Sequence, residues 1–249
     1  VTESMSQEEL FRLSNDAKTP EENAQVQKYW MEMFHNQVDQ PEVHQITRDL
    51  RKVIDEYEDR VLIGETDDIA FYGDNDNELQ LNFNFPLMRT STITADHVRT
   101  NQQERLSALP SWAWPCNTFG NHDSSRIFSN YGDGKNNDVQ SRLHLMLLLT
   151  IKGTPFLYNG EEIGMSDLVI MDPLRFRDPL SNLFYGMAKD VLGLSEESAL
   201  KVGAVRGRDK CRTPMQWAPK PNAGFSPAGM DPWLPVNPDY QLGVNVEDE

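Results

Sequence analysis

Short apolar runs and helically spaced apolar residues alternate along the middle of this chain. Four runs predict strands, at 61–65, 79–85, 116–119 and 154–158. Nearly continuous apolar runs are typical of parallel strands that are buried on both faces. Because helical patterns separate the runs, the sequence predicts βαβ units and therefore an α/β fold with a parallel sheet.

Three stretches have the spacing of helices, at 41–57, 94–109 and 138–150. The first begins with Pro41 and Glu42, which both suit a first helical turn. Its apolar face comprises Val43, Ile46, Leu50, Val53, Ile54 and Tyr57. The opposite face is charged, so we expect this helix on the outside of a larger structure. In the third stretch, one side comprises Val139, Leu143, Met146, Leu147 and Thr150.

The composition divides the chain into three parts. Residues 1–38 are polar and acidic, and we expect loops or short helices there, with helix starts at Ser6 and Thr19. Residues 39–165 hold the predicted strands and their helices. Residues 166–249 are rich in Pro, Gly, Asp and Trp and predict a long excursion after the last strand.

Two features of the excursion carry information about its structure. A plausible helix lies near residues 182–192. Long irregular segments are usually either functional or disordered. The embedded aromatic residues Trp217, Phe225 and Trp233 indicate order here.

The net charge narrows the classes of partner. The 249 residues carry a formal charge of −16, which disfavours nucleic acid and anionic membrane because phosphates would be repelled. A neutral substrate such as a sugar is compatible with this charge. We find no apolar run of about eighteen residues and no signal peptide, and the two cysteines, Cys116 and Cys211, fit reduced thiols. These features lead us to expect a cytoplasmic protein.

Two acidic residues follow predicted buried strands. Glu65 ends the first run, and Asp123 follows the third run after Asn121 and His122. In α/β barrels, acids at the carboxyl ends of strands are typical of active sites, and two carboxyl groups are what glycosidic bond cleavage requires. Such an acid is more often a helix cap or a solvated loop residue. His122 is equally compatible with a metal ligand or a structural histidine.

A second acidic pair, Glu161 and Glu162, follows the fourth run. Neighbouring side chains generally point in different directions. We therefore expect one of the two to line a pocket or hold a loop, and the other to face water.

The motifs resemble those of the α-amylase superfamily, in its α-glucosidase branch. Residues 119–126, FGNHDSSR, and 153–165, GTPFLYNGEEIGM, resemble the segments that end the family's seventh and eighth barrel strands. Residues 207–217, GRDKCRTPMQW, resemble its segment after the barrel. Weaker similarities are found at 40–44, QPEVH, 61–65, VLIGE, 221–225, PNAGF, and 232–237, PWLPVN. Together these motifs imply a partial (β/α)8 TIM barrel, with strands five to eight and their helices.

The resemblance implies a role for each site residue. Glu65 would be the general acid/base, and Asp123 the fixed carboxylate that stabilises the transition state. His122 and its neighbour Asn121 would contact the sugar, and Arg126 would shape the leaving-group side. The implied substrate is a small α-glucoside such as maltose or a short α-glucan, and we expect no cofactor and no metal.

One part of the family pattern is missing. The family's nucleophile is an aspartate after a Gly-Phe-Arg-x-Asp pattern on strand four, which does not occur in residues 1–60. The nearest dipeptides, Phe11-Arg12 and Asn15-Asp16, have a polar, helical context. We therefore expect a fragment of a retaining α-glucoside hydrolase that is inactive alone.

Two other functions stay open. A transglycosylase or isomerase, such as a trehalose-forming enzyme, would use the same carboxyl groups. A non-catalytic relative, resembling the heavy chains of amino-acid transporters, is disfavoured because Glu65, His122 and Asp123 are all present.

Overall fold

The structure is a computed structural model that describes residues 19–35 and 40–249. The helix start predicted at Ser6 lies outside these residues, as do the dipeptides Phe11-Arg12 and Asn15-Asp16. Of the helices in the described ranges, none combines the length and the apolar character that crossing a membrane requires.

Each of the four apolar runs contains a short parallel strand. Strand β1 (Ile63–Gly64) pairs with β2 (Leu81–Asn82), and β3 (Cys116–Thr118) pairs with β4 (Thr154–Phe156). Both pairs are parallel, as predicted, but they form two separate two-stranded sheets. The expectation of one continuous sheet is therefore wrong for the described residues.

Side-chain hydrogen bonds join β2 to β3 where a continuous sheet would have a backbone ladder. Asn84 Nδ2 donates to Asn117 Oδ1 at 2.9 Å, and the Cys116 thiol donates to the carbonyl of Asn82 at 3.1 Å. Buried amide groups need such partners. These contacts keep the strand pairs adjacent, although their backbones do not form a ladder.

The main helices lie where the spacing predicts them. They are α3 (Glu42–Ile54), α5 (Ala95–Ala108) and α7 (Asn137–Thr150). Helix α2 (Pro20–Phe34) begins at Thr19, as predicted, because Thr19 and Glu22 form a capping box in which each side chain accepts the other residue's backbone N–H. This arrangement satisfies two backbone donors at the start of the helix.

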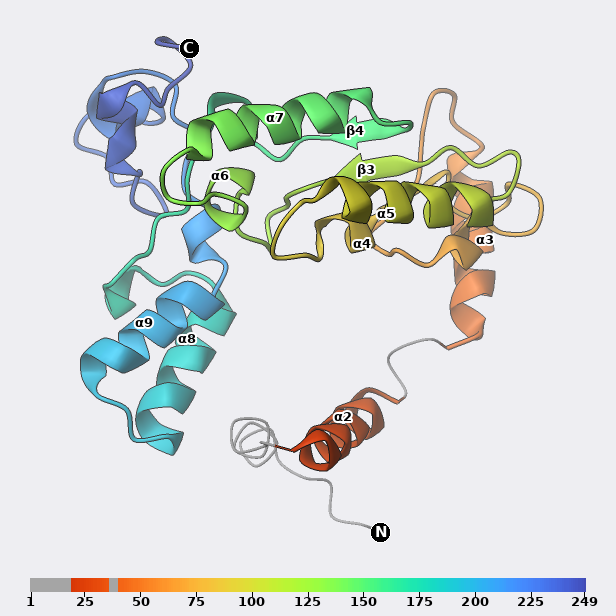
Figure 1. Cartoon of the computed structure of the whole chain (residues 1–249), viewed down its shortest axis with the longest axis horizontal. Coiled ribbons are helices and arrows are strands. Elements are labelled where there is room, and N and C mark those ends of the chain that lie inside the picture. Colours follow the sequence, from red (N-terminus) through yellow and green to blue (C-terminus); the bar gives the residue numbers. More distant parts are fainter. Residues whose placement is uncertain (1–18, 36–39) are drawn as a thin grey trace.

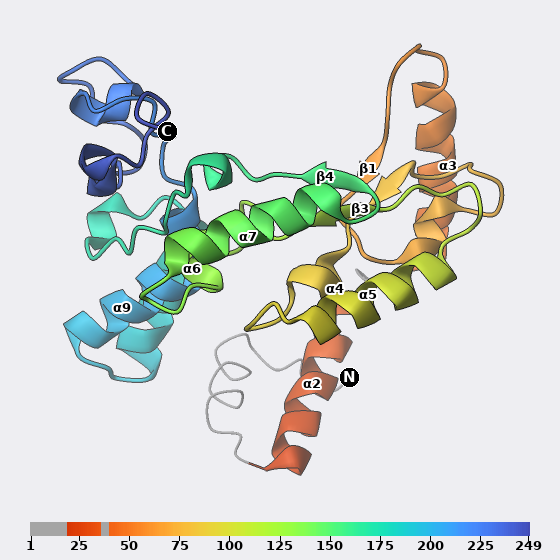
Figure 2. The ribbon, with the colours of Figure 1, turned by 45° about the horizontal axis from the view of Figure 1, so that its top comes forward.

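The excursion after β4 contains two helices, of which the sequence predicted one. Helix α8 (Pro179–Gly186) continues into a π-helical turn η4 (Met187–Val191), and α9 is Glu196–Arg206. Helices α8 and α9 lie side by side (Figures 1 and 2). The sequence signal for α9 was present in Ser195, whose hydroxyl accepts the backbone N–H of Ser198 at 3.3 Å.

The remaining elements are short. They are α4 (Phe85–Met88), α6 (Ile127–Asn130), and the 3₁₀ turns η1 (Ile69–Tyr72), η2 (Glu161–Ile163), η3 (Pro173–Arg175), η5 (Asp209–Cys211), η6 (Pro221–Gly224) and η7 (Pro238–Leu242). The excursion is ordered, as its aromatic residues predicted. Phe225 and Trp233 pack edge to face with ring centroids 4.9 Å apart, and Met215 packs in a buried cluster with Ile163 and Met165.

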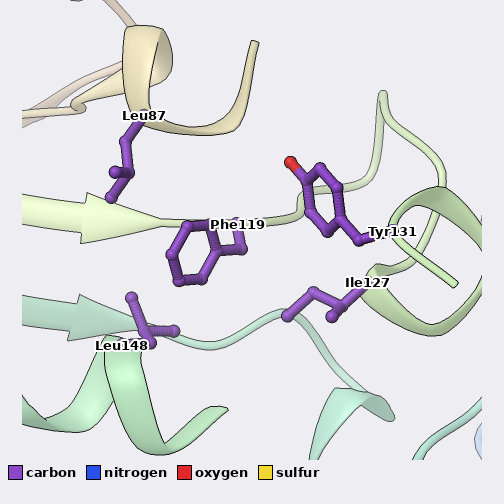
Figure 3. Packing of buried hydrophobic residues seen from close by; sticks show 5 residues of the cluster. All are labelled: Leu87, Phe119, Ile127, Tyr131 and Leu148. Atoms are coloured by element: carbon purple, nitrogen blue, oxygen red, sulfur yellow. The ribbon is translucent and has the colours of Figure 1, made fainter. Parts of the chain in front are cut away.

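The principal core lies around the end of β3. Figure 3 shows Phe119 between Leu87 and Leu148, with Ile127 and Tyr131 closing the cluster. All five side chains are buried, and they come from α4, α6, α7 and the segments that follow β3 and α6. Because Phe119 precedes Asn121 by two residues, this core anchors the loop that carries Asp123.

Helix α3 turns its charged face inward, contrary to the usual orientation of an outer helix. His44 Nδ1 and Arg48 Nη1 each contact the buried carboxylate of Glu78 at 2.8 Å, and Thr47 is buried. Four of the six residues of the predicted apolar face are exposed instead, namely Ile46, Leu50, Val53 and Tyr57, whereas Val43 and Ile54 are partly buried. The outer position of α3 was expected, but its orientation reflects the ionic contacts with Glu78.

Helix α7 also differs from its predicted pattern. Its buried residues are Ser141, His144 and Leu148, and Leu145 and Leu147 pack against the principal core. The residues Val139, Leu143 and Met146, which were grouped with Leu147 on one side, are exposed. The second half of the helix is largely apolar, so periodicity alone did not identify the face that packs on the principal core.

Candidate active site

The two predicted carboxylates come from the ends of different strand pairs. Glu65 directly follows β1, and Asp123 lies in the loop after β3. The loop begins with Gly120, where an added Cβ atom would collide with the buried carboxylate of Glu161. Asn121 Oδ1 then accepts the backbone N–H of Asp123 at 2.9 Å, which fixes the turn.

The structure brings Glu65, His122 and Asp123 together. One side-chain nitrogen or oxygen atom from each residue lies within 4.8 Å of those of the other two, and all three residues are exposed. His122 Nε2 lies 3.3 Å from Asp123 Oδ1. The geometry therefore gives two carboxyl groups and an imidazole at one solvent-accessible point, which suits a hydroxyl-bearing ligand.

Two arginines from the excursion contact Asp123, and the sequence reasoning did not single them out. Arg212 Nη2 donates to Asp123 Oδ1, and Arg208 Nη1 donates to the same atom at 3.1 Å. Their cationic groups offset the charge of the carboxylate and hold it in one orientation. The available sequence signal was the 207–217 motif, which supplied a resemblance but no role for its arginines.

Arg208 is itself held by a buried acid, Asp178. The Asp178 carboxylate accepts Arg208 Nε at 3.0 Å and Nη2 at 2.8 Å, as well as the Arg208 backbone N–H at 2.8 Å. Burial alone would raise the pKa of Asp178, but the hydrogen bonds and charge of Arg208 outweigh it and lower that pKa. The same bonds raise the pKa of Arg208. This pair keeps one guanidinium nitrogen aimed at Asp123.

The segment around η5 connects the loop after β3 to the turn after β4. Arg212 Nε donates to the carbonyl of His122 at 2.7 Å, and the Cys211 thiol lies 3.4 Å from the same carbonyl oxygen. Tyr158 Oη donates to the carbonyl of Cys211 at 3.0 Å. Three segments distant in sequence thus meet at one point, where Cys211 and Arg212 restrain the backbone beside Asp123.

Arg126 does not reach the cluster. Its side chain is fully buried, its Nη1 donates to the carbonyl of Asn159, and its guanidinium lies 5.0 Å from the ring centroid of Tyr158. Asp167 Oδ1 accepts its backbone N–H at 2.9 Å. In this structure Arg126 therefore supports the turn after β4 beneath the site, a different place from the leaving-group contact that the resemblance implies.

Of the acidic pair Glu161 and Glu162, one residue is buried and holds a turn while the other faces water, as the sequence predicted. Glu162 is exposed, and its Oε2 accepts the backbone N–H of Gly160 at 2.7 Å. Glu161 is buried, and its Oε2 accepts the backbone N–H of Tyr158 at 3.1 Å, so it holds the turn. Burial raises the pKa of Glu161 to about 7. Its Oε1 has no hydrogen-bond partner among the described residues.

The cluster also has the donor types of metal sites. Carboxylates and imidazole both bind divalent cations. Here, however, Asp123 already contacts two guanidinium groups, which would repel a cation at the same oxygen. The arrangement favours an uncharged ligand with hydroxyl groups over a metal ion.

Comparison with known proteins identifies the family. The family model described as "Alpha amylase, catalytic domain" matches residues 9–249. The chain belongs to the α-amylase family. It is 30% identical over 224 residues to an oligo-1,6-glucosidase from Halalkalibacterium halodurans, a match that covers 83% of this chain and 39% of that relative.

Solved structures of this family agree with the fold. A trehalose-6-phosphate hydrolase from Bacillus licheniformis has a TM-score of 0.70 at 26% identity, covering 84% of this chain and 40% of that chain. A trehalulose synthase from Pseudomonas mesoacidophila has a TM-score of 0.71 at 26% identity, with the same coverage. The chain therefore spans about two fifths of the length of the α-amylase relatives that it matches.

Proposed function

We propose that the protein containing this chain is a retaining α-glucoside hydrolase that acts on maltose or short α-glucans. The observation that carries the proposal is the convergence of Glu65, His122 and Asp123 at one exposed point, with Asp123 held by Arg208 and Arg212. Family membership and the oligo-1,6-glucosidase relative support a glycoside as the substrate. The four β/α units would correspond to strands five to eight of the family's barrel.

In this proposal each residue has a defined task. Glu65 donates a proton to the glycosidic oxygen as the bond breaks, and then removes a proton from the attacking water. Asp123 binds ring hydroxyls and offsets the positive charge that grows on the sugar. His122 and Asn121 hydrogen-bond the same sugar, while Arg126 positions the turn after β4. The nucleophile would come from a part of the protein outside this sequence.

The test is the hydrolysis of maltose and isomaltose by the protein expressed from its whole coding sequence. We expect Glu65→Gln to lower turnover by about a hundredfold or more, because the leaving oxygen loses its proton donor. A matched control is Glu162→Gln, since this exposed acid contacts the Gly160 backbone and lies outside the cluster. Near-normal turnover of Glu65→Gln on both sugars would remove the proposed role of Glu65.

A transglycosylating or isomerising activity is the second candidate. It is favoured by the likeness to a trehalulose synthase, which uses the same family scaffold. The carboxyl groups would perform the same steps, and only the acceptor would differ. Chromatography of the products separates the two, because a hydrolase releases free glucose as its main product and an isomerase releases a rearranged disaccharide.

A further inference from the structure

Two buried acids join the start of α8 to the segment that carries Arg208. Asp178 directly precedes α8, Asp209 begins η5, and each residue is only 2% exposed. The backbone N–H groups of Arg177 and Asp178 donate to Asp209 Oδ2 and Oδ1, both at 2.9 Å. In return, the Asp178 carboxylate accepts the backbone N–H of Arg208 at 2.8 Å. Each acid thus binds the backbone of the other's segment, and we call this reciprocal arrangement the aspartate clasp.

The two segments of the clasp approach too closely for a side chain at residue 207. Gly207 directly follows α9, and a Cβ atom added there would collide with Ser181 Oγ in α8. The φ of Gly207 is −74°, which any residue adopts, so glycine is needed here for space. Because Gly207 directly precedes Arg208, this packing holds the backbone of Arg208 in addition to the hydrogen bonds of the clasp.

Arg208 connects the clasp to the candidate active site. The Asp178 carboxylate accepts hydrogen bonds from Nε and Nη2 of Arg208, and Nη1 donates to Asp123 Oδ1 at 3.1 Å. A guanidinium group is planar and rigid, so fixing two of its nitrogens also fixes the direction of the third. Asp209 is buried and lies outside the exposed cluster that contains Asp123. Its influence on this cluster would therefore pass through Asp178 and Arg208.

We propose that Asp209 is a positioning residue that orients Asp123 through Asp178 and Arg208. Asp209 fixes the backbone of Asp178, the Asp178 carboxylate aims Arg208, and Arg208 holds the carboxylate of Asp123. Arg212 also contacts Asp123, so loss of the clasp should impair the orientation of Asp123 without abolishing it. The kinetic consequence rests on the proposed hydrolase function, because it assumes that Asp123 stabilises the transition state.

The kinetic test compares Asp209→Asn with Asp172→Asn in the protein expressed from its whole coding sequence. Asparagine has the size of aspartate, but only its carbonyl oxygen accepts hydrogen bonds, so one bond of the clasp is lost. We expect kcat on maltose and isomaltose to fall by about tenfold while KM stays within about twofold, because the lost orientation matters mainly in the transition state. Asp172→Asn is the matched control and should keep the parental kcat. Asp172 is exposed, and its carboxylate accepts the backbone N–H of Leu174 at 3.0 Å, outside the clasp.

A double-mutant cycle separates positioning from a general loss of folded enzyme. Arg208→Lys removes the planar group that links Asp178 to Asp123, since an ammonium group does not reproduce the geometry of a guanidinium. Asp209→Asn should lower kcat by about tenfold in the parent but by less than about twofold in the Arg208→Lys background. A purely structural defect would lower kcat by the same factor in both backgrounds. That result would overturn the proposal, as would a parental kcat for Asp209→Asn.

Hydrogen exchange provides a second readout, which needs no activity. The backbone N–H of Asp123 donates to Asn121 Oδ1 at 2.9 Å, and that of Ser124 to the Asn121 carbonyl at 3.3 Å. Both amides should exchange faster in Asp209→Asn and at the parental rate in the control; equal rates in all three proteins would overturn the proposal. A parent that does not hydrolyse α-glucosides contradicts the proposed function, and hydrogen exchange then decides the role of Asp209. Gly207→Ala, whose added Cβ atom would displace the same backbone, replaces Asp209→Asn if that variant does not fold.

Discussion

At the scale of single residues, the buried carboxyl group of Glu161 should make the stability of the fold depend on pH. Its ordinary pKa is 4.5, and burial raises it to about 7 in the folded chain. The folded state thus keeps a proton that the unfolded state loses as the pH rises above 4.5. The stabilisation from this proton is complete below pH 4.5, falls as the pH approaches 7, and is lost above it.

We therefore expect Glu161→Gln to remove this pH dependence. At pH 8 the variant should be more stable than the parent by at most about 3 kcal/mol, because a buried charge is replaced by a neutral amide. Near pH 4.5 the two should have similar stability. The measurement is the urea midpoint at both pH values, made on the protein expressed from its whole coding sequence. A parent midpoint that rises between pH 5 and pH 8 would contradict the assignment.

The residues of the site divide into those that sequence could identify and those that it could not. The carboxylates Glu65 and Asp123 each follow an apolar run, so the rule for strand ends identified them. Arg208 and Arg212 lie in an irregular segment, where no periodicity indicates which side chains meet. The burial of Arg126 was not predictable for a related reason, because sequence does not show whether an arginine after a strand points into a site or beneath it.

At the scale of elements, the contact between α3 and Glu78 determines how the helix lies. Glu78→Ala would remove the buried partner of both His44 and Arg48. We expect the free energy of unfolding of α3 to fall by about 1–3 kcal/mol. The lower end of this range is favoured because the side chains of His44 and Arg48 are each about a third exposed. Hydrogen exchange should become faster at the amides of α3 and stay unchanged in α7.

The control for this substitution is Asp76→Asn, because asparagine removes the charge and still tolerates the φ of 53° at this position. Asp76 contacts Arg51 of the same helix, but its side chain is 53% exposed, so its removal should have little effect. Equal exchange rates in the two variants would show that burial of Glu78 does not matter for α3.

Local signals were sufficient to predict the positions of the four strands and of the longer helices. The helix start at Thr19 and the apolar run before Glu65 both depend on a few neighbouring residues, and the structure has a helix after Thr19 and a strand before Glu65. The inward face of α3 and the split between β2 and β3 depend on distant partners, Glu78 and Asn117. Periodicity contains no information about such partners, so these two features were not predictable from it.

At the scale of the whole molecule, the exposed apolar faces predict the behaviour of the isolated chain. The isolated chain should bind the dye ANS strongly and melt over a broad temperature range, because α3 and α7 each expose a contiguous apolar face. A sharp, cooperative transition of the isolated monomer, with little ANS bound, is the result that would contradict this prediction.

The ion pairs of Asp123 also have a kinetic consequence. Arg208 and Arg212 follow Asp123 by 85 and 89 residues, so each pair closes a long loop. Long-range contacts form slowly because the entropy of a large loop must be lost before the contact is gained. We therefore expect Asp123 to acquire its final orientation late in folding, after Asp178 has engaged Arg208. A substitution that slows the pairing of Asp178 with Arg208 should therefore delay the appearance of a competent site.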